Sequence, residues 1–329
     1  MADKTAIEWC DATWNPVVGC SIVSKGCTNC YAMKMAARLE AMGQPIYRGM
    51  AAPSKTGPVW TGAVRLNPAV LAKPLSWRRP RRIFVNSMSD LFHESLPDEA
   101  IDRVFAVMAL CPQHTFQVLT KRPERMRAYM RARDGMGDAA LCRAINAIPA
   151  ALGNRHGALE MPLPNVWLGV SVEDQAAADA RIPILLDTPA ARRFISAEPL
   201  LGPVDLAATV RRCTLAGTIV PDGKTHPLGW VIAGGESGPG ARPMHPDWAR
   251  GLRDQCADAG VPFFFKQWGA WRPSCCSLAD RRSLAAVHHN GPVVYSPDIT
   301  TGDEVLMRRI GKAAAGALLD GREHRDFPR

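Results

Sequence analysis

The sequence is poor in long apolar runs: no stretch approaches the roughly eighteen apolar residues that a membrane-spanning helix needs. Its first residues, Met-Ala-Asp-Lys-Thr-Ala-Ile-Glu-Trp, also lack the apolar segment of a secretory signal. Internal repeats and low-complexity tracts are absent as well. We therefore expect a cytoplasmic protein without a membrane partner.

Cysteine is too sparse for a disulfide-stabilised scaffold, with ten residues in a chain of 329. A reducing cytoplasm disfavours disulfides, so clustered cysteines there indicate a metal or redox site. Cys111, Cys142 and Cys256 lie in apolar helical runs and are expected in the core.

Acidic residues are outnumbered by basic ones, 31 to 40, which gives a formal net charge of +9. This surplus favours a polyanionic partner, and we expect a nucleic acid. A solvated positive surface is the alternative. Hydrophobic residues make up 47% of the chain, an ordinary share for a globular protein with a large core.

Three cysteines lie close together near the start of the chain, spaced Cys20-x6-Cys27-x2-Cys30. Thiolates at such spacing suit an iron–sulfur cluster or a zinc ion. A structural zinc normally has four protein ligands, whereas a cluster held by three cysteines leaves one iron open to a substrate or cofactor. We favour the iron–sulfur cluster over the zinc ion. A zinc knuckle completed by Cys10 or a histidine is the alternative.

Further along, short β-type runs alternate with helical ones. We expect strands at 7–18, 83–88, 115–119, 166–171, 193–196, 230–233 and 261–265. Alternation of this kind predicts parallel βαβ units. The last six strands end in polar residues or glycine, as in barrels with active sites at the carboxyl ends of the strands. An open doubly wound sheet leaves a similar pattern and is the alternative.

The expected fold class is therefore α/β, a partial or full parallel (β/α) barrel over residues 1–269. Residues 43–62 are rich in Gly and Pro and are expected to form an excursion from the barrel. Residues 270–329 differ in character and are expected to be a C-terminal extension packed on the barrel.

Basic and polar side chains at strand ends are candidate contacts to phosphates of a nucleic acid. A Trp among arginines offers a stacking face with charge, a combination used in single-strand binding. Solvated strand ends and a solvated pre-strand run are the alternatives. The expected substrate-binding residues are Trp77, Arg78, Arg79, Lys121, Arg122, Lys266 and Gln267.

With these segments assembled, the sequence resembles a phage-associated family of uncharacterised radical-SAM-like proteins (the DUF5131 type), distantly similar to spore photoproduct lyase. The segments that carry the resemblance are 8–16, 20–31, 84–92, 119–122, 167–171, 196–200, 234–238, 265–269 and 319–321. The cysteine spacing is three residues longer than the commonest radical-SAM spacing, Cys-x3-Cys-x2-Cys.

The resemblance implies a radical-SAM barrel with a [4Fe–4S] cluster on Cys20, Cys27 and Cys30. S-adenosylmethionine would bind the fourth iron, and an electron donor would drive its cleavage to a radical. The implied enzyme is of the lyase or DNA-repair type and acts on nucleic acid, with photolesion repair as the closest precedent. The expected cofactor-binding residues are Tyr31, Ser87, Asp90, Ser171, Glu198, Gly234, Gly235 and Glu236.

Several of these residues have plainer alternative roles. Asp90 suits a helix cap, Glu198 a surface ion pair, and the Gly234-Gly235 pair a simple turn. Two alternatives also stand beside the expected activity. One is a non-catalytic iron–sulfur protein that binds nucleic acid, and the other is a radical enzyme that acts on a peptide or small molecule.

Overall fold

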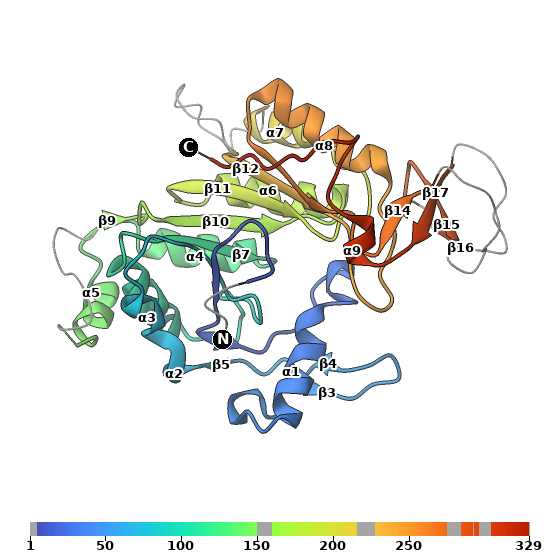
Figure 1. Cartoon of the computed structure of the whole chain (residues 1–329). Coiled ribbons are helices and arrows are strands. Elements are labelled where there is room, and N and C mark those ends of the chain that lie inside the picture. Colours follow the sequence, from blue (N-terminus) through green and yellow to red (C-terminus); the bar gives the residue numbers. More distant parts are fainter. Residues whose placement is uncertain are drawn as a thin grey trace. The chain divides into compact units, whose positions relative to one another are not determined.

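The computed structural model describes residues 5–149, 160–215, 228–274, 284–291, 293–295 and 304–328. The chain divides into two compact units. The first comprises Met1–Val170 and Asp187–Arg193, and the second comprises Ser171–Leu186 and Phe194–Arg329. Figure 1 shows the elements of both units in chain order.

Parallel strands form the centre of the first unit. β1 (Ala12–Trp14) pairs with β6 (Arg82–Val85), β6 with β7 (Thr115–Thr120), and β7 with β10 (Val166–Ser171). These strands are apolar along most of their length and largely buried, as parallel strands covered on both faces require.

Helices follow these strands where the sequence predicts them. In α3 (Asp98–Ala109), two acidic residues lie in the first turn and Ile101, Val104 and Phe105 are buried. This arrangement complements the helix dipole and gives the helix one apolar face. The basic helix is α4 (Pro123–Ala132), and the next helix is α5 (Ala139–Asn146).

The Gly- and Pro-rich excursion packs against α1 (Tyr31–Ala41), the helix that follows the cysteine loop. It contains a small hairpin, β3 (Ala51–Ala52) with β4 (Val59–Trp60), that contacts α1. Met50 and Trp60 share a buried cluster with Met33 and Ala36. The excursion therefore packs against α1 and helps to hold this helix, which follows the cysteine loop, in place. Smaller elements of this unit are β2 (Val17–Val18), β5 (Arg65–Leu66), α2 (Pro68–Leu71), β8 (Gly135–Met136) and β9 (Glu160–Met161).

The second unit continues the parallel pattern with β11 (Arg192–Ala197), β12 (Trp230–Gly234) and β13 (Phe263–Gln267). Its helices are α6 (Gln175–Leu186), α7 (Leu206–Leu215) and α8 (Pro246–Ala259). α8 ends, as the sequence predicts, at Gly260, whose φ of 65° is left-handed. The chain near residues 324–326 pairs along the outer edge of β13.

Each of the seven predicted strands contains a strand of one parallel sheet, in the order β1-β6-β7-β10-β11-β12-β13. Of the strand expected at 7–18, only Ala12–Trp14 belongs to this sheet, because Val17–Val18 pairs antiparallel with β5. Each strand adds beside its predecessor in this series, and the order has no reversal of the kind that defines a doubly wound sheet. The order also has two ends and does not close into a ring. The fold is therefore mixed α/β, and it is a partial barrel rather than a full one.

The C-terminal residues form an antiparallel sheet that the sequence did not predict. Its order is β14-β17-β15-β16, from β14 (Trp271–Pro273), β15 (Leu284–His288), β16 (Val293–Tyr295) and β17 (Glu304–Arg309), followed by α9 (Lys312–Ala315). Residues 275–283, 292, 296–303 and 329 of the expected extension lie outside the described residues. No helix within the described ranges is long and apolar enough to cross a membrane.

Candidate cysteine-loop site

The cysteine loop begins where β2 ends, at a position that only glycine fits. Gly19 has a φ of +87°, and a Cβ there would lie 2.0 Å from the carbonyl oxygen of Ala63. Cys27 ends a short 3-10 helix (Lys25–Cys27), and Cys30 is the N-cap residue of α1. Each cysteine is therefore fixed by a different local feature of one loop.

Arg122, just after β7, binds the loop to the sheet. Its Nη1 donates to Asp90 Oδ2 at 3.1 Å and lies 3.8 Å from Cys20 Sγ, while its Nη2 donates to Ser21 Oγ at 2.7 Å. Nε is 2.9 Å from both carboxylate oxygens of Glu94. Arg122 is 4% exposed. Arg122, which the sequence suggested as a phosphate contact, is therefore buried between the loop and the end of β7.

Asp90 is the acceptor at the centre of this network. Besides Arg122, its carboxylate accepts hydrogen bonds from Phe92 N, Thr120 Oγ1 and Lys121 N, at 2.7–3.0 Å. The next helix, α3, has Pro97 as its N-cap, so Asp90 does not cap it. Its carboxylate therefore links the segment after β6 to the end of β7, next to Cys20.

A buried histidine fixes the residue after Cys20. His93 Nδ1 accepts from Ser95 N at 3.2 Å, so the proton of the neutral ring lies on Nε2, which is 2.9 Å from Ser21 Oγ. Burial, and then the charge of Arg122, lower the pKa of His93, which keeps the ring neutral. Ser21 Oγ therefore accepts from both His93 and Arg122.

Burial raises the pKa of two of the loop thiols, Cys20 and Cys30. Burial, and then the Asp90 charge, raise the pKa of Cys20 to about 12 although Arg122 acts against this shift. Burial also raises the pKa of Cys30, against the opposing effect of backbone N–H groups of Ala32 and Met33. Metal binding to these sulfurs would therefore release protons.

The loop thiols are not used in disulfides. None of the seven cysteines whose side chains are described is in a disulfide. Within the described residues, the group of three metal-ligating side chains whose atoms lie within 4.8 Å of one another is His245, Asp247 and His289, and the loop cysteines do not form such a group.

Two expected cofactor residues meet beside the loop. Tyr31 Oη donates to the carbonyl oxygen of Ser87 at 2.7 Å, and Ser87 Oγ donates to Asn15 Oδ1 at 3.1 Å. The Tyr31 ring is 54% exposed. The start of α1 is therefore tied to the end of β6.

In the second unit, three strand ends meet around Glu198. Its carboxylate is 3.1 Å from Lys266 Nζ, and a Cβ on Gly234 would lie 2.6 Å from Glu198 Oε1. Ser196 Oγ donates to the same carboxylate at 3.3 Å. A side chain at Gly234 would therefore displace the Glu198 carboxylate, which forms a half-buried ion pair.

The remaining expected residues of this unit are buried. Glu236 accepts from Arg242 Nε and Nη2 at 2.9 and 2.7 Å. A Cβ on Gly235 would lie 2.0 Å from the carbonyl oxygen of Trp268, so this glycine permits two backbones to pack together. Ser171 and Gln267 are buried.

The predicted stacking residue is not available to a base. Trp77 is 7% exposed, with the Arg81 guanidinium 4.9 Å from its ring centroid. Arg78 and Arg79 are exposed, and Lys121 is half-exposed. The arginines therefore place positive charge at the surface, but the Trp77 ring beside them is not exposed for stacking.

A family model described as "Protein of unknown function (DUF5131)" matches residues 4–328. The chain belongs to this family. No curated protein and no solved structure matches the chain.

In this DUF5131 chain, the first unit brings together the loop cysteines with Tyr31, Ser87, Asp90 and Arg122. The second unit brings Glu198 to Gly234 and Lys266. Sequence reasoning missed Ser21 and His93, which anchor the loop. The sequence does place His93 three residues after Asp90, close behind a strand. A single histidine in such a position can have many roles, so its contact with the loop was not predicted.

Proposed function

We propose that this DUF5131 protein binds a [4Fe–4S] cluster through Cys20, Cys27 and Cys30 and uses S-adenosylmethionine in radical chemistry on nucleic acid. The observation that carries the proposal is the loop itself. It offers three thiols outside any disulfide, and its first cysteine is anchored through Arg122 and Asp90 to the ends of two parallel strands. A preorganised ligand loop supports a resident metal group.

The residues around the loop have defined tasks in this proposal. The three thiolates hold the metal group, and the Arg122 guanidinium beside Cys20 offsets negative charge. Cys30 caps the N-terminus of α1, where the helix dipole favours an anionic ligand. Ser21 and His93 keep the loop backbone in place. When bound, the cluster and S-adenosylmethionine supply the one-electron cleavage that generates a carbon radical.

The finer parts of the proposal come from the sequence resemblance. They are the radical-SAM type of barrel, cofactor contacts from Tyr31, Ser87 and Glu198, an external electron donor, and a lyase-type repair of DNA photolesions. The net charge of +9 and the exposed Arg78 and Arg79 support a polyanionic substrate.

The test is formation of 5′-deoxyadenosine by the anaerobically reconstituted protein with S-adenosylmethionine and dithionite, with and without irradiated DNA. We expect 5′-deoxyadenosine, with more formed when irradiated DNA is present. A Cys142→Ser variant, changed at a cysteine far from the loop in sequence, is the control and should match the wild type. Absence of 5′-deoxyadenosine together with salt-dependent DNA binding would contradict the enzyme and favour the non-catalytic alternative. Formation that DNA does not affect would contradict the nucleic-acid substrate.

A further inference from the structure

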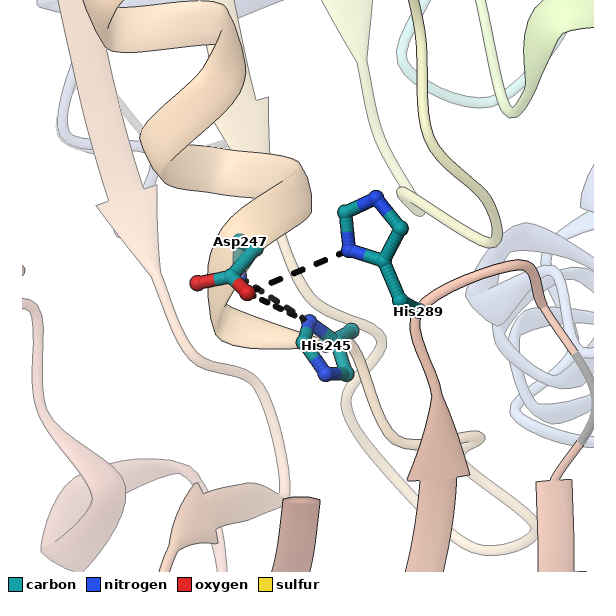
Figure 2. A group of neighbouring side chains, drawn as sticks. All are labelled: His245, Asp247 and His289. Atoms are coloured by element: carbon teal, nitrogen blue, oxygen red, sulfur yellow. Dashed lines mark hydrogen bonds and ion pairs between the residues drawn. The ribbon is translucent and has the colours of Figure 1, made fainter. Parts of the chain in front are cut away.

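A group of three side chains with metal-ligating atoms lies in the second unit, apart in sequence from the cysteine loop. It consists of His245, Asp247 and His289 (Figure 2). Asp247 Oδ2 is 3.9 Å from the Nδ1 atoms of both histidines. These separations are too long for hydrogen bonds, so the carboxylate oxygen stands between two ring nitrogens without binding either.

The two segments that carry the group are held together by a separate contact. His245 and Asp247 start α8, whereas His289 lies in the turn after β15. Buried Trp248 donates from Nε1 to the carbonyl oxygen of His289 at 2.6 Å. The turn is therefore fixed to the helix start by its backbone, and the three residues are held near one another before any ligand arrives.

The buried histidine presents a lone pair to the group. His245 Nδ1 accepts a hydrogen bond from Asp247 N at 3.1 Å, so the proton of the neutral ring lies on Nε2. A cation at Nδ1 would replace the Asp247 N–H at the same lone pair.

The carboxylate is oriented from its other side. Asp247 Oδ1 accepts from Arg250 Nη1 at 2.8 Å, which leaves Oδ2 facing the two rings. The Arg250 charge is itself balanced, because Asp320 accepts from its Nη2 at 2.6 Å. Partners of this kind commonly orient metal ligands.

We propose that His245, Asp247 and His289 form a second metal site, for a divalent transition ion of the zinc class. Two imidazoles and one carboxylate suit Zn²⁺, Co²⁺ or Ni²⁺ and do not suit Ca²⁺ or Mg²⁺. A tetrahedral ion with bonds of about 2.0–2.2 Å places its N and O ligands about 3.4 Å apart. The two separations from Asp247 must close from 3.9 Å by about half an ångström, and the ligating atoms of the two histidines, which lie within 4.8 Å of each other, must close by up to about 1.4 Å. The exposed Asp247 and His289 side chains allow these movements.

This site goes beyond the proposed function and does not depend on it. Three protein ligands leave coordination positions open to water or a substrate. The site is also distinguishable from the cysteine loop, because its ligands contain no sulfur.

The test is titration of the full chain with Co²⁺, followed by absorption and by counting bound ions after dialysis. Thiolate-bound Co²⁺ has a sulfur charge-transfer band that Co²⁺ bound by nitrogen and oxygen lacks, so the two sites are read separately. We expect His289→Ala and Asp247→Asn each to weaken the sulfur-free site at least tenfold. Both residues are exposed, so these variants should fold.

His288→Ala is the matched control, because His288 is the last residue of β15, directly before His289, and pairs with Glu304. It should bind the ion as the wild type does. Equal binding by the wild type and by the His289→Ala and Asp247→Asn variants would overturn the proposal, as would absence of any sulfur-free Co²⁺ signal in the wild type.

Discussion

Replacing Arg122 with Met should weaken the first unit more than any comparable change at the surface. Arg122 and Asp90 have side chains only 4% and 8% exposed. Removing one partner of a buried ion pair leaves a buried charge and typically costs about 3–5 kcal/mol. Asp90 keeps three other hydrogen-bond donors, so we expect a value near the lower end, about 3 kcal/mol. The Glu94 side chain is 64% exposed, and its pair with Arg122 adds under about 1 kcal/mol.

The assay is urea unfolding, with the free energy of unfolding compared between variants. Arg125→Met is the matched control, because Arg125 pairs with Asp98 where both side chains are 27–38% exposed. It should lose about 1 kcal/mol or less. The double variant Asp90→Asn with Arg122→Met should lose less than the sum of the single losses, since the two residues interact. A loss at Arg122 no larger than that at Arg125 would refute the reasoning.

Two further variants test particular contacts. Gly19→Ala should lower the free energy of unfolding by at least about 2 kcal/mol and reduce the amount of iron bound, because the new Cβ would clash with a carbonyl oxygen. Gly49 has a similar φ but open space around it, so Gly49→Ala should lower the free energy of unfolding by about 1 kcal/mol. Equal losses would contradict the close approach. Hydrogen bonds from Arg250 lower the pKa of Asp320 to about 2. The stability from Asp320 is therefore present above about pH 4 and is lost as pH falls toward 2. Acid titration of Asp320→Asn should show a deficit under about 1 kcal/mol near pH 5 that disappears near pH 2; a constant deficit would contradict the ion pair.

The parallel strands were predictable because their signals are local. Each is a short apolar run with a polar end, and all seven lie where the sequence placed them. The sheet order was not predictable from these runs, because a barrel and a doubly wound sheet share them. The antiparallel C-terminal sheet was missed because its strands pair across long separations, as Trp271 does with Arg309.

The cysteines of the candidate site were predictable from the sequence, but the contacts of the residues around them were less so. The spacing of Cys20, Cys27 and Cys30 identified the loop. The burial of Arg122 and Trp77 was not predicted, because a sequence does not show whether a basic or aromatic side chain is buried among partners. The packing reason for Gly235 was also hidden, since it depends on Trp268, which is distant in sequence.

The central claim is that Cys20, Cys27 and Cys30 hold an iron–sulfur cluster. Its most direct test is anaerobic reconstitution with iron and sulfide, followed by absorption and by iron and sulfide counts. We predict about four of each per chain, with the broad visible absorption of thiolate-bound clusters. The signal should be lost in the triple Ala variant of the loop and kept in Cys10→Ser, which removes the alternative zinc ligand. Survival of the absorption in the triple variant, or its absence from the wild type, would contradict the claim.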